Sequence, residues 1–235
     1  MTVGLMNGEG IMKKFFLVTL LYVTAGILSA HAVTTVSIQE DNPTYKLKIQ
    51  YPSDFSVKAI NKAVIQLIDT QKNEFLKIAK IDNMPADVPG KNSLFIGYKT
   101  PYQANKALSL VFDFSIYNRG GAHPRNFMAS LNFIEGQEVT LEQLFISGKD
   151  YLTPLSSFCR EKLALQKFSD EKWVLEGSKP EKQNFKIWYF TNNGLAIVFD
   201  TYQVAAYVYG PQTIEIPKSD LINLIKPDVI PAVWG

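Results

Sequence analysis

The sequence predicts a single α+β domain in which an antiparallel β-sheet packs against one long helix and a few shorter helices. Apolar residues recur at spacings of three, four and seven over residues 55–80, which is typical of an amphipathic helix. Over residues 107–117 the pattern changes to a period of two, which is typical of a strand with one face in the core. The dipeptide Asn193-Gly194 adds the strongest short-range signal for a β-hairpin.

Residues 1–32 have the pattern of a signal peptide and are expected to lie outside the domain. Two lysines, Lys13 and Lys14, precede an apolar run at 15–28, and an Ala-His-Ala sequence ending at Ala32 offers a cleavage site. The run is shorter than the roughly 20 apolar residues that span a bilayer. We therefore predict cleavage after Ala32 in preference to a retained anchor, an exported protein that is periplasmic or secreted, no membrane span after cleavage, and one domain over residues 33–235.

The net charge and the cysteine content exclude some classes of partner and one source of stability. The formal net charge is only +2, so no strong positive field is present to attract nucleic acid or an anionic membrane. Cys159 is the only cysteine, which excludes an internal disulfide even in an exported protein. Stability must therefore come from packing.

The first half of the chain predicts strands on either side of the long helix. Residues 33–51 alternate loosely and predict one half-buried strand. After the helix and a turn-rich break at 84–90, strands are expected at 93–99 and 107–117. We assign the apolar stripe of the long helix to the core and not to a partner groove. The stripe consists of Ile60, Val64, Leu67, Ile68, Phe75 and Ile78.

A second alternating segment at 127–133 follows the strand at 107–117, and the two predict an antiparallel hairpin. The loop between them has the sequence Gly120-Gly121-Ala122-His123-Pro124. Both glycines are expected to adopt positive φ angles, and Pro124 to fix the exit of the loop.

The second half predicts more short elements. Thr140 and Gln143 have the spacing of a capping box, so a short helix is expected to start at Thr140. A helix is expected over 149–168, with Cys159 facing the core. The remaining predicted elements are strands at 185–190 and 195–200 around the turn at 192–194, a strand at 213–216 and a last helix that begins at Lys218 or Ser219 and ends at Ile225.

Three segments taken together resemble one known family. They are the Gly120-Gly121-Ala122-His123-Pro124 loop, the stretch 136–145 with its capping box, and the stretch 193–217 with Tyr202 and Tyr207. Their order and spacing resemble the extracellular domain of the lysozyme-sensing anti-sigma-V factors. The same kind of domain precedes the catalytic domain of some secreted peptidoglycan deacetylases. The resemblance covers about residues 40–225.

The resemblance implies an α+β domain with an antiparallel sheet and a non-catalytic role in binding or sensing. The partner it implies is a lysozyme-like protein or peptidoglycan. The anti-sigma factors carry a sigma-binding segment and a membrane span before this domain, and the deacetylases carry a catalytic domain after it, and the sequence contains no counterpart of these segments. The resemblance assigns no contact with lysozyme to particular residues.

His123 is the obvious candidate for chemistry because imidazole titrates near neutrality and binds metals. A zinc site needs three or four ligands, and residues 33–235 contain no second histidine, so no metal is expected. A nucleophilic pair with Cys159 would need an exposed thiol, whereas the helical pattern buries it. We instead expect His123 to form a hydrogen bond directed into the protein that locks the hairpin. On that basis His123→Ala would cost about 1 to 3 kcal/mol of stability if it left a buried partner unpaired.

Tyr202, Tyr207 and Tyr209 form a candidate surface for a sugar or a protein, because tyrosine offers a flat ring and a hydroxyl at low entropic cost. Packing of these rings in the core is the favoured interpretation. A glycosidase would need two carboxylates at a defined separation, and the sequence fixes no such separation. The carboxylates considered for this role are Asp113, Glu135, Glu138, Glu142 and Asp200.

The sequence therefore predicts a non-enzymatic, exported binding module of the cell envelope that has no cofactor. The common hydrolase and nucleotide-binding motifs are absent from the sequence, which favours this interpretation. The alternative is an envelope enzyme or accessory module that acts on peptidoglycan or another glycan.

Overall fold

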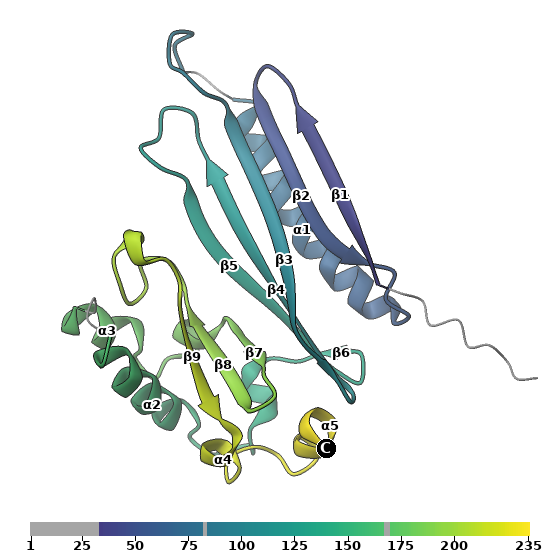
Figure 1. Ribbon diagram of the computed structural model, residues 1–235, viewed down its shortest axis with the longest axis vertical. Coiled ribbons are helices and arrows are strands. Elements are labelled where there is room, and N and C mark those ends of the chain that lie inside the picture. Colours follow the sequence, from purple (N-terminus) through teal and green to yellow (C-terminus); the bar gives the residue numbers. More distant parts are fainter. Residues whose placement is uncertain (1–32, 82–83, 167–169) are drawn as a thin grey trace, which may run out of the picture. The chain divides into compact units, whose positions relative to one another are not determined.

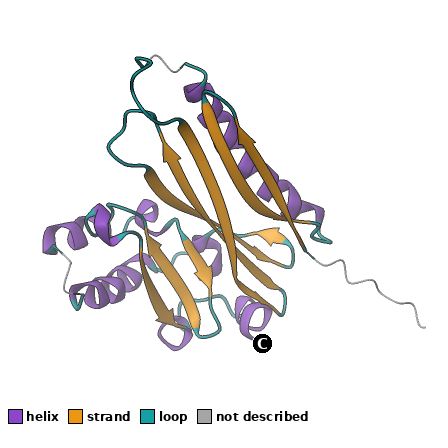
Figure 2. Cartoon of the chain, turned by 45° about the horizontal axis from the view of Figure 1, so that its top comes forward, coloured by secondary structure: helices purple, strands orange, loops and turns teal. Residues whose placement is uncertain are grey.

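The computed structural model describes residues 33–81, 84–166 and 170–235. The predicted signal peptide lies outside the described residues. The architecture is α+β, as predicted, with two sheets whose strands pair almost entirely antiparallel (Figures 1 and 2).

The first sheet has the strand order β1-β2-β3-β4-β5-β6 and the second the order β7-β8-β9. The strands are β1 Thr34–Asp41, β2 Tyr45–Ser53, β3 Asn92–Ala104, β4 Ala107–Tyr117, β5 Arg125–Ile134, β6 Gln137–Glu138, β7 Trp188–Phe190, β8 Gly194–Phe199 and β9 Gln212–Pro217. The α-helices are α1 Lys58–Ala79, α2 Leu152–Ala164, α3 Glu171–Gly177, α4 Lys218–Leu221 and α5 Val229–Trp234. The short 3₁₀ helices are η1 Leu141–Leu144, η2 Lys182–Phe185 and η3 Tyr207–Tyr209.

The single strand predicted over residues 33–51 is wrong, because a turn divides it into β1 and β2. The side chain of Asn42 accepts hydrogen bonds from the backbone N–H groups of Thr44 and Tyr45 at 3.0 and 2.9 Å. Such a side-chain bond to the following backbone is how asparagine stabilises a turn. The alternation of apolar and polar residues runs through both strands and the turn between them, so it did not indicate where the hairpin turns.

Helix α1 connects β2 to β3, which run parallel, and covers one face of the first sheet (Figure 1). Ile60, Val64 and Phe75 are buried against this face, as the sequence predicted. Burial of a side chain of this size contributes about 1.5 to 3 kcal/mol. The placement of Ile78 in the apolar stripe is wrong, because this side chain is 56% exposed one residue before the helix ends.

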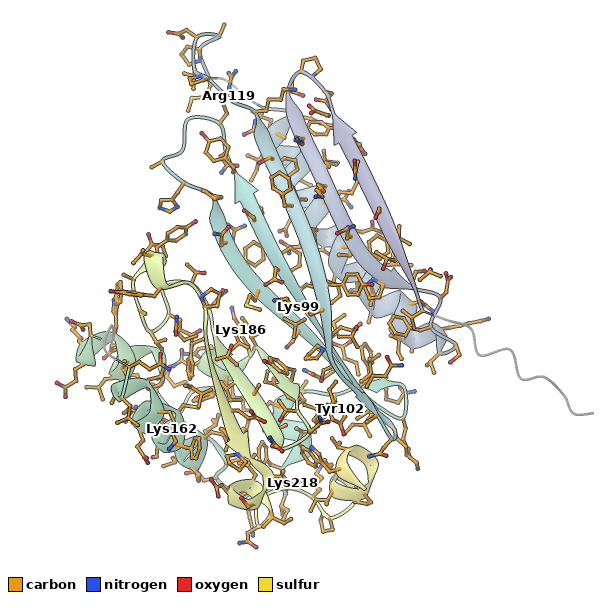
Figure 3. All side chains as sticks on the ribbon, in the orientation of Figure 1. Lys99, Tyr102, Arg119, Lys162, Lys186 and Lys218 are labelled. Atoms are coloured by element: carbon orange, nitrogen blue, oxygen red, sulfur yellow. The ribbon has the colours of Figure 1, made fainter. Side chains whose placement is uncertain are left out.

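Strand β3 is longer than predicted and reaches a second core. A register shift between Lys99 and Tyr102 lets the strand continue to Ala104. Tyr102 (labelled in Figure 3) packs 5.9 Å from the ring of Phe190 and donates a hydrogen bond to the backbone carbonyl of Val233. Side chains of the first sheet, Tyr102 of β3 and Ala107 of β4, therefore contribute to the core of the second.

The second core lies between β7–β9 and the helices that follow the hairpin. Cys159 on α2 is fully buried in it, as predicted. The capping box is also confirmed, since the backbone N–H of Thr140 donates to the Gln143 side chain at 2.7 Å, although the helix it begins is a 3₁₀ helix. Helix α3 was not predicted, because its segment is polar. Asp170 caps it by accepting from the backbone N–H of Trp173.

Polar side chains of the first sheet bind the outer edge of β7. Successive residues of an antiparallel strand direct their backbone groups to alternate sides, so Trp188 and Phe190 direct theirs away from β8. The N–H of Trp188 donates to Ser130 Oγ at 3.1 Å, and its carbonyl accepts from Asn132 Nδ2 at 2.8 Å. The N–H of Phe190 donates to Ser109 Oγ at 2.9 Å, and Ser109 in turn donates to Asn132 Oδ1 at 2.7 Å. These buried and partly buried hydrogen bonds join the two sheets.

We predict that Asn132→Ala lowers the free energy of unfolding by about 1 to 3 kcal/mol, because it leaves the Trp188 carbonyl without its buried donor. Urea denaturation measures the change. Ser115→Ala is the control, because Ser115 lies on the same face of β4 as Ser109 but its side chain forms no hydrogen bond with the described residues. Its free energy of unfolding should stay within about 0.5 kcal/mol of the wild-type value. Equal stability of the two variants would contradict the role given to Asn132.

Candidate functional site

The Gly120–Pro124 loop joins β4 to β5, as the hairpin prediction required. Gly120 has a φ angle of +83°, where glycine is favoured. The same prediction for Gly121 is wrong, because its φ angle is not positive. Its backbone N–H instead closes the turn by donating to the carbonyl of Asn118 at 2.9 Å.

His123 lies on the surface, so the prediction that its hydrogen bond points into the protein is wrong. The imidazole Nδ1 is 2.9 Å from the carbonyl of the neighbouring Pro124, and the side chain is exposed. The ring packs against that of Tyr207, with 4.2 Å between the two centroids. The loop of the first hairpin thus meets a loop from the second half of the chain.

Tyr207 fastens the two loops together. Its hydroxyl donates to the carbonyl of Pro124 at 3.0 Å and accepts from Asn126 Nδ2 at 2.8 Å. The ring of Tyr202 lies 5.5 Å from that of Tyr207, and the ring of Trp173 lies 6.4 Å from that of Tyr202. We call Trp173, Tyr202, Tyr207 and His123 the aromatic cluster.

The prediction that the three tyrosines pack in the core is wrong. Tyr202 is 51% exposed and Tyr209 is 48% exposed, while Tyr207 is only partly covered. Trp173 is 38% exposed beside them. The second core is filled by residues from the β7–β9 sheet and the helices around it, so these rings remain at the surface.

The loop after β8 is held in place by the side chain of Gln203. Its amide nitrogen donates to the carbonyls of Gly177 and Asn184, both at 2.9 Å, and its amide oxygen accepts from the N–H of Asp200 at 2.9 Å. Gly177 ends α3, where a Cβ atom would lie 2.0 Å from the carbonyl oxygen of Gln203. This close contact brings α3, which carries Trp173, next to the loop that carries Tyr202.

Asp200 connects the same loop to the first sheet. Its carboxylate accepts from the backbone N–H of Met128 at 3.2 Å and of Thr201 at 2.9 Å. Burial raises the pKa of Asp200 above its ordinary value, and these hydrogen bonds and the charges of Lys186 and Arg125 oppose the rise.

A groove of about 350 Å³ lies on the first sheet, and Asn126, one of its lining residues, bonds to Tyr207 of the aromatic cluster. Residues such as Ile96 and Phe112 pack with α1, so the alternate residues Gly97 and Asp113 face the other way. The face is open at Gly97, where a Cβ atom would have no atom of the described residues within 4 Å. The groove is lined by Phe95, Gly97, Asp113, Phe114, Ser115, Asn126, Phe127, Met128 and Pro211.

The remaining candidate carboxylates have positively charged partners or lie apart from the cluster. Glu135 pairs with Lys106 and Glu142 with Lys182, both at 2.6 Å. Asp113 lies 4.0 Å from Lys99, and Glu138 lines a separate pocket together with Glu142. The structure therefore places none of these four in the aromatic cluster.

Neither metal chemistry nor a cysteine nucleophile gains support from this geometry. Within the described ranges, no three His, Cys, Asp or Glu side chains are grouped so that they could hold a metal ion. Burial raises the pKa of Cys159 to about 12, so its thiol stays protonated, and a Cys159–His123 pair is unsupported.

Sequence reasoning found three members of the aromatic cluster but not that they meet, and it missed Trp173 and Asn126. Trp173 follows Asp170 by three residues, which is the spacing of an N-cap and its partner, and this was the available signal. Asn126 had no signal, because its role depends on Tyr207, which is far away in the sequence.

The sequence matches two protein families. Residues 38–126 match a family described as Deacetylase PdaC, and residues 142–219 match a protein family of unknown function, DUF3298. His123 lies in the first stretch, and the other three members of the aromatic cluster lie in the second.

The chain is similar to the peptidoglycan-N-acetylmuramic acid deacetylase PdaC of Bacillus subtilis (strain 168), with 28% identity over 202 residues. This alignment covers 84% of the chain but 43% of the deacetylase, so the chain spans less than half of that relative's length. The predicted resemblance to a peptidoglycan deacetylase is thus confirmed for part of such a protein.

Two solved structures share the fold. They are DUF3298-family proteins from Bacteroides fragilis NCTC 9343 and Pseudomonas aeruginosa PAO1, each with a TM-score of 0.59. Their identities are 15% and 14%, they match 85% and 84% of this chain, and 96% of each of those chains is covered.

We predict that His123→Ala changes the free energy of unfolding by less than about 0.5 kcal/mol, because the imidazole is exposed and its hydrogen bond is to the neighbouring Pro124. Tyr207→Phe should cost about 1 kcal/mol, since it removes the two hydrogen bonds that join the loops. Chemical denaturation of both variants checks the order. A larger loss for His123→Ala than for Tyr207→Phe would restore the hairpin-locking role of the histidine.

Asp200→Asn should stabilise the protein at neutral pH. The folded chain holds the Asp200 proton more tightly than the unfolded chain, so this group's contribution to stability is complete below the unfolded pKa and is lost as the pH rises through the folded pKa. Asparagine keeps an acceptor for Met128 and Thr201 without the buried charge. Unfolding free energies measured from pH 4 to pH 8 should show the advantage of the variant growing as the pH rises; an advantage that shrinks over this range would contradict the assignment.

Proposed function

We propose that this chain is a non-catalytic binding module of the cell envelope that holds a glycan strand of peptidoglycan on the aromatic cluster. The observation that carries the proposal is the exposure of these rings at the point where two distant loops meet. The hydrogen bonds of Gln203 hold the loop that carries Tyr202, so this ring offers flat apolar area at little cost in entropy.

The chemistry of the cluster and its groove suits a carbohydrate. Aromatic rings pack against the apolar faces of sugar rings, and tyrosine and histidine add polar atoms for the hydroxyl groups. The adjoining groove supplies the polar side chains of Asp113, Ser115 and Asn126 beside the apolar Phe95. A chain of sugars could therefore extend from the cluster onto the open face of the first sheet.

The likeness to a peptidoglycan deacetylase supports a location in the cell envelope and peptidoglycan as the glycan. The predicted export and the proposed role agree with each other. None of the helices in the three described ranges is long and apolar enough to cross a membrane.

A lysozyme-like protein, the partner implied by the sequence resemblance, stays a prediction. Val208, 80% exposed, and Tyr209 extend the apolar surface beyond the cluster, and such an extension favours contact with a protein. Calorimetry with several lysozymes, alongside peptidoglycan fragments, separates the two partners. Binding of a lysozyme with no binding of glycan would overturn the glycan proposal.

We predict that Tyr202→Ala weakens binding of soluble peptidoglycan fragments about fivefold or more, because it removes an exposed ring of the cluster, 51% of which is accessible to solvent. Ile222→Ala is the matched control. This exposed apolar side chain follows α4, at the opposite end of β9 from the tyrosine loop, and its loss should leave the affinity unchanged.

Isothermal titration calorimetry on both variants gives the affinities. Retained affinity in Tyr202→Ala, or an equal loss in Ile222→Ala, would exclude the aromatic cluster as the binding surface. Incubation with the same fragments followed by mass spectrometry tests the non-catalytic part of the proposal, since any change in mass would identify an enzyme.

A further inference from the structure

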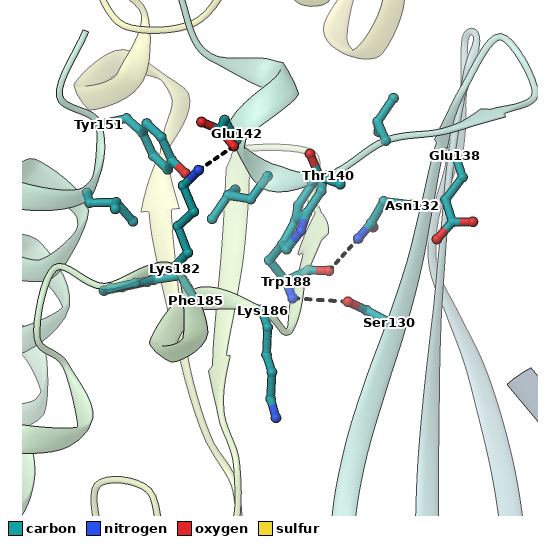
Figure 4. Close-up of a pocket in the computed structure, with 13 residues that line it drawn as sticks. Ser130, Asn132, Glu138, Thr140, Glu142, Tyr151, Lys182, Phe185, Lys186 and Trp188 are labelled. Carbon is teal, nitrogen blue, oxygen red and sulfur yellow. Dashed lines mark hydrogen bonds and ion pairs between the residues drawn. The ribbon is translucent and has the colours of Figure 1, made fainter. Parts of the chain in front are cut away.

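A second site lies in a pocket of about 330 Å³ that shares no residue with the aromatic cluster (Figure 4). It is bounded by the end of β5, the segment from β6 to η1, the start of α2, and η2 with β7. Its volume is at the lower end of the range for small-molecule sites, which suits a ligand of amino-acid size. The walls include the buried rings of Phe185 and Trp188 and the aliphatic side chains of Leu141 and Leu152.

Tyr151 contributes a hydroxyl to the lining of this pocket. The side chain is only 7% exposed, yet its hydroxyl makes no hydrogen bond to any residue in the described ranges. Stacking on Phe145, with centroids 4.5 Å apart and planes 8° from parallel, fixes the ring. Burial raises the pKa of Tyr151, so the hydroxyl keeps its proton and can donate. The hydroxyl is open to the pocket, so a ligand bound there can accept this hydrogen bond.

An ion pair stands beside this hydroxyl (Figure 4). Lys182 Nζ and Glu142 Oε2 are 2.6 Å apart, and the two side chains are 63% and 58% exposed. An exposed pair of this kind contributes about 0 to 1 kcal/mol to stability. Both charges are therefore accessible to a ligand that brings the opposite charges in the matching order.

The charges that line the pocket are balanced. Glu138 and Glu142 would repel a purely anionic ligand. Lys182 and Lys186 would repel a purely cationic one. In Figure 4, Lys186 extends away from the Glu142–Lys182 pair. A neutral ligand would leave the Tyr151 hydroxyl and the ion pair without charged partners. A ligand with one positive and one negative group close together satisfies all of them.

We propose that this pocket binds the zwitterionic α-amino acid group of a small ligand. The carboxylate lies against Lys182 Nζ and accepts from the Tyr151 hydroxyl, while the ammonium group lies against the Glu142 carboxylate. An aliphatic side chain on the ligand packs between Phe185 and Trp188. The group belongs either to a free amino acid or to a peptide side chain that ends in one, such as that of diaminopimelate.

Calorimetry on the full chain with matched probes tests the charge requirement. Leucine is the zwitterion, N-acetylleucine the anion, leucinamide the cation and N-acetylleucinamide the neutral analogue. Leucine should bind at least about tenfold more tightly than each of the other three, since each analogue loses at least one charge-assisted hydrogen bond. A short peptide with an internal diaminopimelate residue forms the second arm, and its affinity relative to leucine separates the two sources.

Variants then assign the binding to this pocket. Tyr151→Phe keeps the stacked ring and should weaken binding of leucine about fivefold, and Lys182→Gln should weaken it about tenfold. Lys106→Gln is the control, because Lys106 and Glu135 form an ion pair of the same length, 2.6 Å, at similar exposure outside the pocket. It should leave the affinity unchanged.

The proposal is overturned if neither leucine nor the diaminopimelate peptide binds at low millimolar concentration, if the neutral analogue binds as tightly as leucine, or if Lys106→Gln weakens binding as much as Lys182→Gln. Tyr202→Ala should leave leucine binding intact. Failure of the glycan proposal is thus visible separately from failure of this one.

Discussion

The attachment of β7 to the first sheet is the interaction on which the rest of the structure depends. An edge strand presents unpaired backbone groups, and burying them without partners would cost more than the packing gains. In most sheets a neighbouring strand supplies these partners. Here they come from side chains on one face of the first sheet, those of Ser109, Ser130 and Asn132. This arrangement lets two sheets with separate cores join face to edge.

Both candidate sites are consequences of this joint. Loops that leave β4 and β8 meet on one side of it, where Tyr207 bonds to the first hairpin and the aromatic cluster forms. On the other side, the end of β5 and the start of β7 enclose the pocket with Tyr151. The same side chains, Ser130 and Asn132, hold β7 and line that pocket.

The proposed functions use two different kinds of physical chemistry in one chain. The aromatic cluster is exposed, mostly apolar and held by a few hydrogen bonds, which suits an extended ligand with flat apolar faces. The pocket is small, has apolar walls and contains opposite charges, which suits a compact ligand with its own opposite charges. A peptidoglycan strand carries both sugars and amino acids, so one polymer could occupy both sites.

The sequence by itself determined the elements that show a local pattern of apolar residues or a characteristic turn sequence. The long helix, the β4–β5 hairpin, the Asn-Gly turn and the burial of Cys159 followed from periodicity and turn chemistry, because those depend on neighbours in the chain. Tertiary structure alone decided that His123 and Tyr202 lie on the surface together and that the Tyr151 hydroxyl has no hydrogen-bond partner among the described residues. Exposure and pairing depend on which distant segments meet, and here a few buried hydrogen bonds between two sheets determine that.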